Sequence, residues 1–81
     1  MKLRFTERLR KSYAAAPKQI QKAFDKQSQL LEQNLLHPSL RAKKYDEACD
    51  VWQARVTRNW RFYFTIERDE YVVIALTPHP K

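Results

Sequence analysis

Three short segments in which apolar and polar side chains alternate limit the fold of this 81-residue chain more than any other feature. Alternation of this kind is typical of half-buried β-strands, and the segments are residues 51–57, 60–66 and 71–77. The connections between them are short enough for hairpins, and because the chain has no glycine, Asn59 and Asp69 are the residues expected to take positive φ. The sequence therefore predicts an antiparallel meander of three strands.

A shorter strand and a short helix are predicted near the first residue. Residues 2–5 alternate basic and apolar side chains, as in a half-buried strand, and the Thr6 hydroxyl can cap a helix that follows. That helix is expected over residues 7–16, because Pro17 disfavours the α conformation in the residue before it. Pro17 can then open a second helix at its first position.

The second helix is the longest predicted element. Apolar residues recur at helical spacing from residue 18 to about residue 35, with Gln27 as the one interruption of the stripe. Residues 36–50 are irregular and charged and are interpreted as a loop. The chain is thus predicted to form a single α+β domain over residues 1–81, in which the N-terminal strand and the meander make one sheet with both helices on one face.

Strand alternation divides the predicted meander into two faces. The face expected to pack on the helices carries large apolar side chains, namely Trp52, Ala54, Val56, Trp60, Phe62, Phe64, Ile66, Val72, Ile74 and Leu76. The opposite face carries Gln53, Arg55, Thr57, Arg61, Tyr63, Thr65, Tyr71 and Thr77. Guanidinium groups bind phosphates and phenol rings stack on unpaired bases, so this face suits RNA, although polar outer faces are also ordinary in antiparallel sheets.

The charge of the chain favours a polyanionic partner. The formal net charge is +7, with 11 basic and 3 acidic side chains in residues 1–44 against 5 and 6 in residues 45–81. A cationic surface attracts nucleic acid, the ribosome or an acidic protein, and the alternative is a basic surface that serves only solubility. Lys18, Lys22 and Lys26 form one helical stripe, which can either follow a phosphate backbone or face water.

Several classes of protein are disfavoured. No apolar run is long enough to span a membrane and residues 1–7 lack the apolar core of a signal peptide, so we expect a cytoplasmic protein with no membrane partner. Cys49 is the single cysteine, and His37 and His79 are the two histidines, so neither an internal disulfide nor a zinc site is expected. No metal or cofactor is predicted.

The order of the elements and three local motifs resemble the RelE/ParE toxin superfamily. The motifs are His37–Leu40, Val51–Val56 and Trp60–Phe64, of which the last two make a hairpin comparable to one that family members carry. The resemblance covers nearly the whole chain. It implies the toxin of a type II toxin–antitoxin system, neutralised by a cognate antitoxin. In the RelE branch it implies a ribosome-dependent endoribonuclease that cleaves messenger RNA by attack of a ribose 2′-hydroxyl on the adjacent phosphate.

The same resemblance implies catalytic roles for four residues. Arg61 matches the family's sheet arginine that holds the scissile phosphate, and His79 matches a histidine proposed as general acid in YoeB-like members. Glu47 resembles the glutamate that those members use as a base, the alternative being a solvated carboxylate. Arg55, on the same predicted face as Arg61, is either a second phosphate donor or the partner of an acidic neighbour in the sheet.

Further residues are implied in RNA binding. Lys43 and Lys44 resemble lysines through which RelE grips or activates the RNA. Family members commonly place a tyrosine beside the histidine, whereas residues 80–81 after His79 contain none, so Tyr63 is the nearest substitute for base stacking. Two other functions remain open. A ParE-like member would bind DNA gyrase without nuclease chemistry, and a degenerate member would be stable but not toxic.

Overall fold

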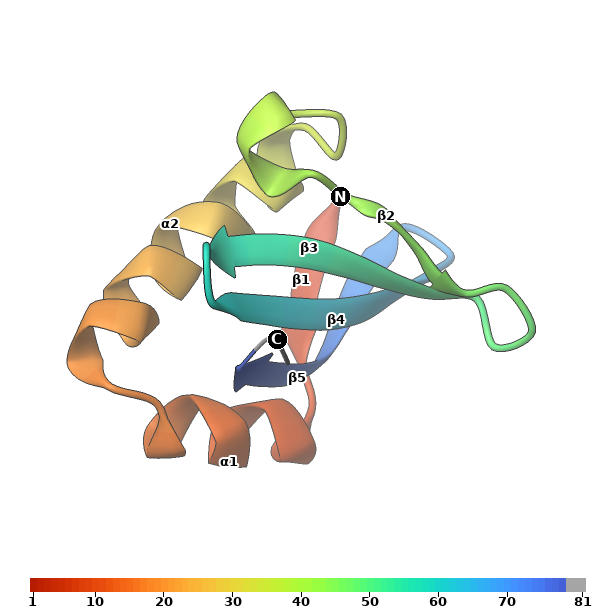
Figure 1. Cartoon of the computed structure of the whole chain (residues 1–81). Coiled ribbons are helices and arrows are strands. Elements are labelled where there is room, and N and C mark those ends of the chain that lie inside the picture. Colours follow the sequence, from red (N-terminus) through yellow and green to blue (C-terminus); the bar gives the residue numbers. More distant parts are fainter. Residues whose placement is uncertain (79–81) are drawn as a thin grey trace.

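One mixed sheet of five strands forms the centre of the molecule in the computed structural model, which describes residues 1–78 (Figure 1). The strands follow the order β1-β5-β4-β3-β2 across the sheet. Their bounds are Lys2–Phe5 for β1, Lys43–Asp46 for β2, Val51–Thr57 for β3, Trp60–Glu67 for β4 and Glu70–Pro78 for β5. β1 is parallel to β5, and the other neighbours are antiparallel. The predicted N-terminal strand and the predicted meander are confirmed.

Two helices precede the meander, α1 over Glu7–Ala15 and α2 over Lys18–Gln33. The Thr6 hydroxyl accepts a hydrogen bond from the backbone N–H of Leu9 at 3.1 Å, which is the predicted N-cap. Both predicted helices are confirmed, although each ends slightly earlier than expected. No helix within residues 1–78 is long and apolar enough to cross a membrane.

The hydrophobic core lies between the helices and one face of the sheet. Phe62 and Phe64 on β4 are fully buried there, and the Phe62 ring meets Phe24 of α2 edge to face at a centroid distance of 5.3 Å. Leu31 is also fully buried, while Trp60 packs against this cluster and stays partly exposed. Removal of such side chains from water is the main favourable contribution to folding. The predicted apolar face of β4 is thus confirmed except at Ile66, which is 38% exposed and not part of the core.

Residues 36–50 are more ordered than the predicted loop. Pro38–Leu40 form a short 3₁₀ helix, η1, and β2 pairs with β3 so that Lys43 lies opposite Gln53. The interpretation of the whole stretch as a loop is therefore wrong. An edge strand of four residues, two of them lysine, carries little hydrophobic alternation. Short, charged edge strands are a common protection against pairing with another chain, and the same composition hides the strand from pattern analysis.

A β-bulge in β5 changes which side chains of that strand face the core. Tyr63 pairs with Ala75, but the next residue of β4, Phe64, pairs with Val73, so Ile74 is an extra residue between the two pairs. One extra residue reverses the alternation of the strand, because successive side chains point to opposite faces.

This bulge makes three of the predicted positions wrong. Tyr71 lies in the core, 6% exposed and with its ring centroid 5.6 Å from that of Phe64, instead of on the outer face. Val72 pairs with Thr65 on the outer face, although it is buried there at 3% exposure, and Ile74 lines a pocket on that face, whereas both were expected to face the helices. The bulge has no counterpart in the alternation pattern on which the prediction depends.

The turns also differ from the prediction. Positive φ occurs at Arg41, Asp50 and Arg68, and the expected residues, Asn59 and Asp69, do not adopt it. In the β4–β5 turn the positive φ falls on the residue before the expected one. The β3–β4 hairpin contains a register shift close to its turn, and a bulge of this kind supplies twist that the turn itself would otherwise provide.

Helix α1 covers the edge of β5 that β1 leaves open. β1 pairs with Glu70–Val73, and beyond this point the backbone of β5 forms hydrogen bonds to the α1 segment instead. The Thr6 hydroxyl donates to the Val73 carbonyl at 3.2 Å, and the Leu76 N–H donates to the Ser12 hydroxyl at 3.1 Å. Figure 1 shows α1 beside the end of β5. A helix in this position protects an open strand edge.

Replacing Ser12 by alanine is expected to lower the free energy of unfolding by about 1–3 kcal/mol, because the N–H of the buried Leu76 would lose its acceptor. Urea denaturation followed by circular dichroism measures the effect. Ser39→Ala is the matched control, since Ser39 is exposed and its replacement should change the free energy by less than about 0.5 kcal/mol. If Ser12→Ala and Ser39→Ala unfold at the same urea concentration, the Ser12 hydroxyl does not stabilise the edge of β5.

Candidate functional site

The sheet face opposite the core is open and carries polar side chains from β2, β3 and β4. Lys43, Gln53 and Tyr63 lie directly opposite one another across these three strands, and Arg55 lies opposite Arg61. Because alternate side chains of a strand share a face, Arg55, Arg61 and Tyr63 lie together as predicted. The hydrogen bonds between the three strands hold the backbone of these residues in place.

Four cationic side chains surround a cavity of about 190 Å³ on this open face. We call it the arginine pocket, and its cations are Arg41, Lys43, Arg55 and Arg61. Gln53 and Ala54 complete the lining. The pocket thus joins β2, β3 and β4 with the residue that follows η1.

The cations of the arginine pocket have no acidic partner within the described residues, because the three ion pairs of residues 1–78 all lie elsewhere. Arg55 faces Arg61 instead of an acidic neighbour, and like charges directly opposite each other destabilise a sheet. Burial lowers the pKa of Arg61, and the charges of Arg55 and Arg41 lower it further. A bound anion would remove this repulsion.

The guanidinium of Arg61 is held by the backbone of the β3–β4 hairpin. Its Nη1 donates to the carbonyl oxygens of Thr57 at 2.7 Å, Trp60 at 3.0 Å and Arg58 at 3.2 Å. The other donors, on Nε and Nη2, are unused within the described residues. Arginine binds a phosphate through two parallel N–H bonds in the plane of the guanidinium, and Nε and Nη2 form such a pair.

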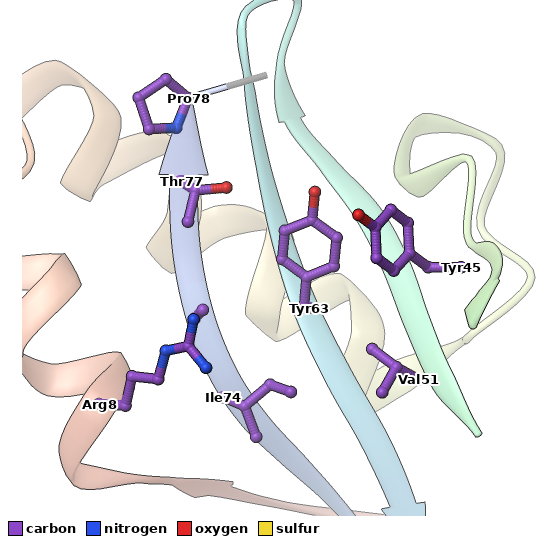
Figure 2. A pocket seen from close by; sticks show the side chains of 8 residues that line it. Arg8, Tyr45, Val51, Tyr63, Ile74, Thr77 and Pro78 are labelled. Carbon is purple, nitrogen blue, oxygen red and sulfur yellow. The ribbon is translucent and has the colours of Figure 1, made fainter. Parts of the chain in front are cut away.

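A second hollow on the same face is lined by aromatic and apolar side chains (Figure 2). We call it the tyrosine pocket; its volume is about 400 Å³, and its lining includes Arg8, Tyr45, Tyr63, Ile74 and Ala75. The rings of Tyr45 and Tyr63 meet edge to face with their centroids 4.9 Å apart. A cationic hollow and an aromatic hollow therefore lie on the same sheet face.

Comparisons with known proteins identify the fold. In sequence, the chain matches no protein-family model and no curated protein. In structure, it is similar to a YoeB/ParE toxin from Agrobacterium tumefaciens, with a TM-score of 0.79, 15% identity, and coverage of 99% of this chain and 100% of that one. A chain of an archaeal RelE–RelB complex from Pyrococcus horikoshii gives a TM-score of 0.80 at 15% identity, with 99% of this chain and 96% of that one covered. A YoeB dimer from Staphylococcus aureus gives 0.79 at 13% identity, with 99% and 98% covered. The chain has the RelE/ParE toxin fold.

The RelE/ParE fold brings four of the predicted site residues onto one face, and these are Arg61, Arg55, Lys43 and Tyr63. Three of them line the arginine pocket, and Tyr63 lines the tyrosine pocket beside it. The predicted general acid, His79, lies outside the described residues. Residues 1–78 contain no group of His, Cys, Asp and Glu side chains able to hold a metal ion.

Lys44 does not share the position of Lys43 in this fold. Its Nζ lies 5.5 Å from the centroid of the Trp52 ring and donates a hydrogen bond to Asp50, which raises the pKa of Lys44. Trp52 belongs to the core side of β3, so the two lysines lie on opposite faces of β2. Lys43 alone of this pair reaches the arginine pocket.

Glu47 and the lysine stripe of α2 line neither pocket. Glu47 is in the β2–β3 turn, at the opposite end of β3 from Arg55, and about 13 Å of strand lies between that turn and Arg55. Lys18, Lys22 and Lys26 are exposed on α2, which packs on the other face of the sheet. The structure does not bring these four residues to the arginine pocket.

Three charged or aromatic residues of the two pockets were not found by sequence analysis, and these are Arg8, Arg41 and Tyr45. Arg41 and Tyr45 come from the stretch interpreted as a loop. Arg8 reaches the open face because α1 lies along β5, which is a contact between distant parts of the chain. No local signal indicated β2, because residues 43–46 carry little alternation of apolar and polar side chains.

Gln27, the polar interruption in the apolar stripe of α2, stabilises the arginine pocket from the core side of the sheet. It is buried, and its Nε2 donates to the carbonyl of Arg55 at 2.9 Å and to the carbonyl of Ser39 at 3.2 Å. These two bonds tie η1 to β3. Arg41, which directly follows η1, is thereby held next to Arg55.

Arg41 has a left-handed backbone, with φ 46° and ψ 42°, which costs a residue with a β-carbon about 1–2 kcal/mol. Glycine removes that cost, so Arg41→Gly should leave the free energy of unfolding unchanged or raise it by up to about 1 kcal/mol. The same change removes one cation. It should therefore reduce the rise in melting temperature that inorganic phosphate produces by binding the folded state.

Arg68→Gly is the matched control for this prediction. Arg68 also has positive φ, at 55°, but lies in the β4–β5 turn outside the arginine pocket. Its replacement removes the same charge and should keep the full response to phosphate. An equal loss of response in the two variants would show that overall charge binds the anion.

Proposed function

We propose that this protein is the toxin of a type II toxin–antitoxin system and that it acts as a ribosome-dependent endoribonuclease on messenger RNA. The observation that carries the proposal is the arginine pocket, where Arg55 opposes Arg61 on an open sheet face without an acidic partner in the described residues. Such a pocket suits a phosphate group of RNA. The RelE/ParE fold supports the toxin role, because proteins of this fold include toxins.

The proposed reaction is attack of a ribose 2′-oxygen on the adjacent phosphorus, with breakage of the bond from phosphorus to the 5′-oxygen. One product ends in a 2′,3′-cyclic phosphate and the other in a 5′-hydroxyl. Negative charge grows on the phosphoryl oxygens in the transition state, and fixed donors placed there are among the largest contributions to catalysis. Arg61 supplies Nε and Nη2 for this role, Arg55 donates from the facing strand, and Lys43 grips the RNA beside them.

The reaction also needs a base for the 2′-hydroxyl and an acid for the leaving 5′-oxygen. His79 is the proposed acid, because imidazole titrates near neutral pH. Glu47, the base expected from the family resemblance, lies in the β2–β3 turn and away from the arginine pocket. This geometry does not favour Glu47 as the base.

We also propose a cognate antitoxin as partner and the ribosome, in the cytoplasm, as the place of action. The similar structures include a RelE–RelB complex and a YoeB–YefM complex. The net charge of +7 and the cationic, aromatic open face favour an antitoxin that is acidic or that lays an amphipathic helix across this face.

Controlled expression in bacterial cells tests the proposed function. Transcripts are mapped by primer extension after induction, using matched messages with and without a working translation start. We expect growth arrest and new 5′ ends in the translated message alone. Intact messages together with gyrase-linked DNA breaks would overturn the nuclease and indicate a ParE-like gyrase inhibitor. Normal growth with neither effect would indicate a non-toxic protein.

A further inference from the structure

Gln53 is a buried glutamine of the arginine pocket whose side-chain amide forms no hydrogen bond within residues 1–78. It is 6% exposed. Gln27, the other buried glutamine of the described residues, donates from its amide to two carbonyl oxygens. No side-chain nitrogen or oxygen of residues 1–78 is both fully buried and without a partner, so the Gln53 amide keeps contact with the open space of the pocket. Because buried polar groups are normally hydrogen-bonded, this amide is available to a ligand.

Strand pairing fixes where this amide lies. Gln53 is directly opposite Tyr63 of β4 on one side and Lys43 of β2 on the other, so its backbone is held from both sides. It precedes Arg55 by two residues in β3, so the two side chains share a face and their Cα atoms are about 6.6 Å apart. Arg55 in turn lies opposite Arg61. The amide therefore borders the place that the proposed function gives to the scissile phosphate.

The amide differs in chemistry from the charged part of the lining. Four lining residues carry side-chain donors alone, namely Arg41, Lys43, Arg55 and Arg61. The Gln53 Oε1 is therefore the one side-chain acceptor among the described residues that line the pocket. A phosphate diester offers acceptors alone and is matched by the cations, whereas a ribose 2′-hydroxyl both donates and accepts. The proton of such a hydroxyl finds its side-chain acceptor at Gln53, and the neutral amide does not repel the phosphate beside it.

We propose that Gln53 binds the ribose 2′-hydroxyl beside the phosphate in the arginine pocket and thereby selects RNA over DNA. This inference rests on the proposed action on RNA and adds to it a residue that determines the class of nucleic acid. The 2′-oxygen and the 3′-oxygen that carries the phosphate are on adjacent carbons of one ribose, so a single nucleotide can contact Gln53 and Arg61 together. The amide is not a base, so Gln53 orients the hydroxyl and leaves its proton in place. DNA has no hydroxyl there, and its binding would leave Oε1 without a partner.

Binding of three fluorescein-labelled hexamers to the full chain tests this role. All three are oligouridylates that differ only in the 2′-substituent, which is hydroxyl, fluorine or hydrogen, and ribosomes are omitted so that the proposed reaction does not cleave them. The unaltered protein should bind the 2′-hydroxyl hexamer about 5- to 30-fold more tightly than the 2′-deoxy hexamer, the effect of leaving one acceptor unpaired. The 2′-fluoro hexamer keeps the sugar pucker of RNA but has no proton for Oε1, so it should bind as weakly as the deoxy hexamer.

Two variants of Gln53 remove the contact in different ways. Gln53→Met keeps nearly the same size without the amide, so it should bind all three hexamers with the affinity that the unaltered protein has for the deoxy hexamer. Gln53→Asn keeps the amide but withdraws it by one methylene, so it should also lose the preference, and it serves as the test if the methionine variant does not fold. Melting temperatures confirm that each variant is folded.

Gln29→Met is the matched control, since Gln29 is exposed on α2 and lies outside both pockets. It should keep the full preference for the 2′-hydroxyl hexamer. Arg61→Gln should weaken binding of all three hexamers by the same factor, because all of them retain the phosphate.

The possible results separate the role of Gln53 from the proposed function. Equal binding of the hydroxyl and deoxy hexamers by the unaltered protein, or an undiminished preference in a folded Gln53 variant, would overturn this role, while a common loss of affinity in Arg61→Gln would still support the phosphate site. Tight binding of the 2′-fluoro hexamer would also overturn it, because the sugar pucker would then select RNA. If the unaltered protein binds no hexamer even at low salt, the proposed action on RNA fails and the role of Gln53 fails with it.

Discussion

Replacement of Phe62 by alanine is expected to lower the free energy of unfolding by about 3–5 kcal/mol, the cost of truncating a buried phenylalanine. Phe62 is 0% exposed, and its ring centroid lies 5.3 Å from that of Phe24 and 5.8 Å from that of Phe64. Truncation would leave a cavity where the sheet meets α2. Because small domains have a total stability of about 5–15 kcal/mol, a large part of the protein should unfold. Thermal and urea denaturation followed by circular dichroism measure the loss.

Ile66→Ala is the matched control for Phe62→Ala. Ile66 is another large apolar residue of β4 on the same face, but it is 38% exposed, so its truncation should cost less than about 1 kcal/mol. Equal destabilisation of the two variants would contradict the core assigned to β4. The result bears on the site as well, because Arg61 and Tyr63 point outward only while Phe62 points inward.

Apolar and polar residues alternate in β3 and β4, and this pattern made it possible to predict which side chains of these strands face the core. A shift of one residue would expose Phe62 and Phe64 to water, so Arg55, Arg61 and Tyr63 had to share the opposite face. In β5 the expected alternation was wrong, because residues 71–76 are all apolar, and a continuous apolar run does not tell the two faces apart. The bulge that shapes the tyrosine pocket therefore could not be predicted.

The arginine pocket was predictable only in the part that the sheet supplies. Lys43 and Lys44 are adjacent residues of the same type, so the sequence does not distinguish them. The pairing of β2 with β3 places Lys43 on the open face and Lys44 over the ring of Trp52. Arg41 joins the pocket through its left-handed backbone and through the hydrogen bonds of Gln27 that hold η1 on β3. Contacts of this kind link distant parts of the chain, and no local pattern contains them.

Replacement of Arg61 by lysine is expected to slow cleavage of ribosome-bound message by about 10²- to 10³-fold, the loss typical of one fixed transition-state donor. Lysine keeps the charge but cannot supply two parallel N–H bonds to a phosphate. Purified protein, ribosomes and a translated message, followed by primer extension over time, give the rate. Arg58→Lys is the matched control, because Arg58 is an exposed residue of the same hairpin outside the arginine pocket and its replacement should leave the rate unchanged.

The loss of cleavage in Arg61→Lys should not come from unfolding. Folding lowers the pKa of Arg61, through burial and then through Arg55 and Arg41, so the folded chain holds this charge less readily than the unfolded chain does. The resulting destabilisation is present at all pH values below the lowered pKa and fades as pH rises through it, and because Arg61→Lys keeps the charge, the replacement does not change this effect near neutral pH. The melting temperature of Arg61→Lys should therefore stay far above that of Phe62→Ala, and a fall to the same value would make the activity loss structural.

A lysine variant that cleaves normally would show that charge alone carries the chemistry. Intact message with the unaltered protein, together with gyrase-linked breaks in cells, would replace the nuclease with a gyrase inhibitor.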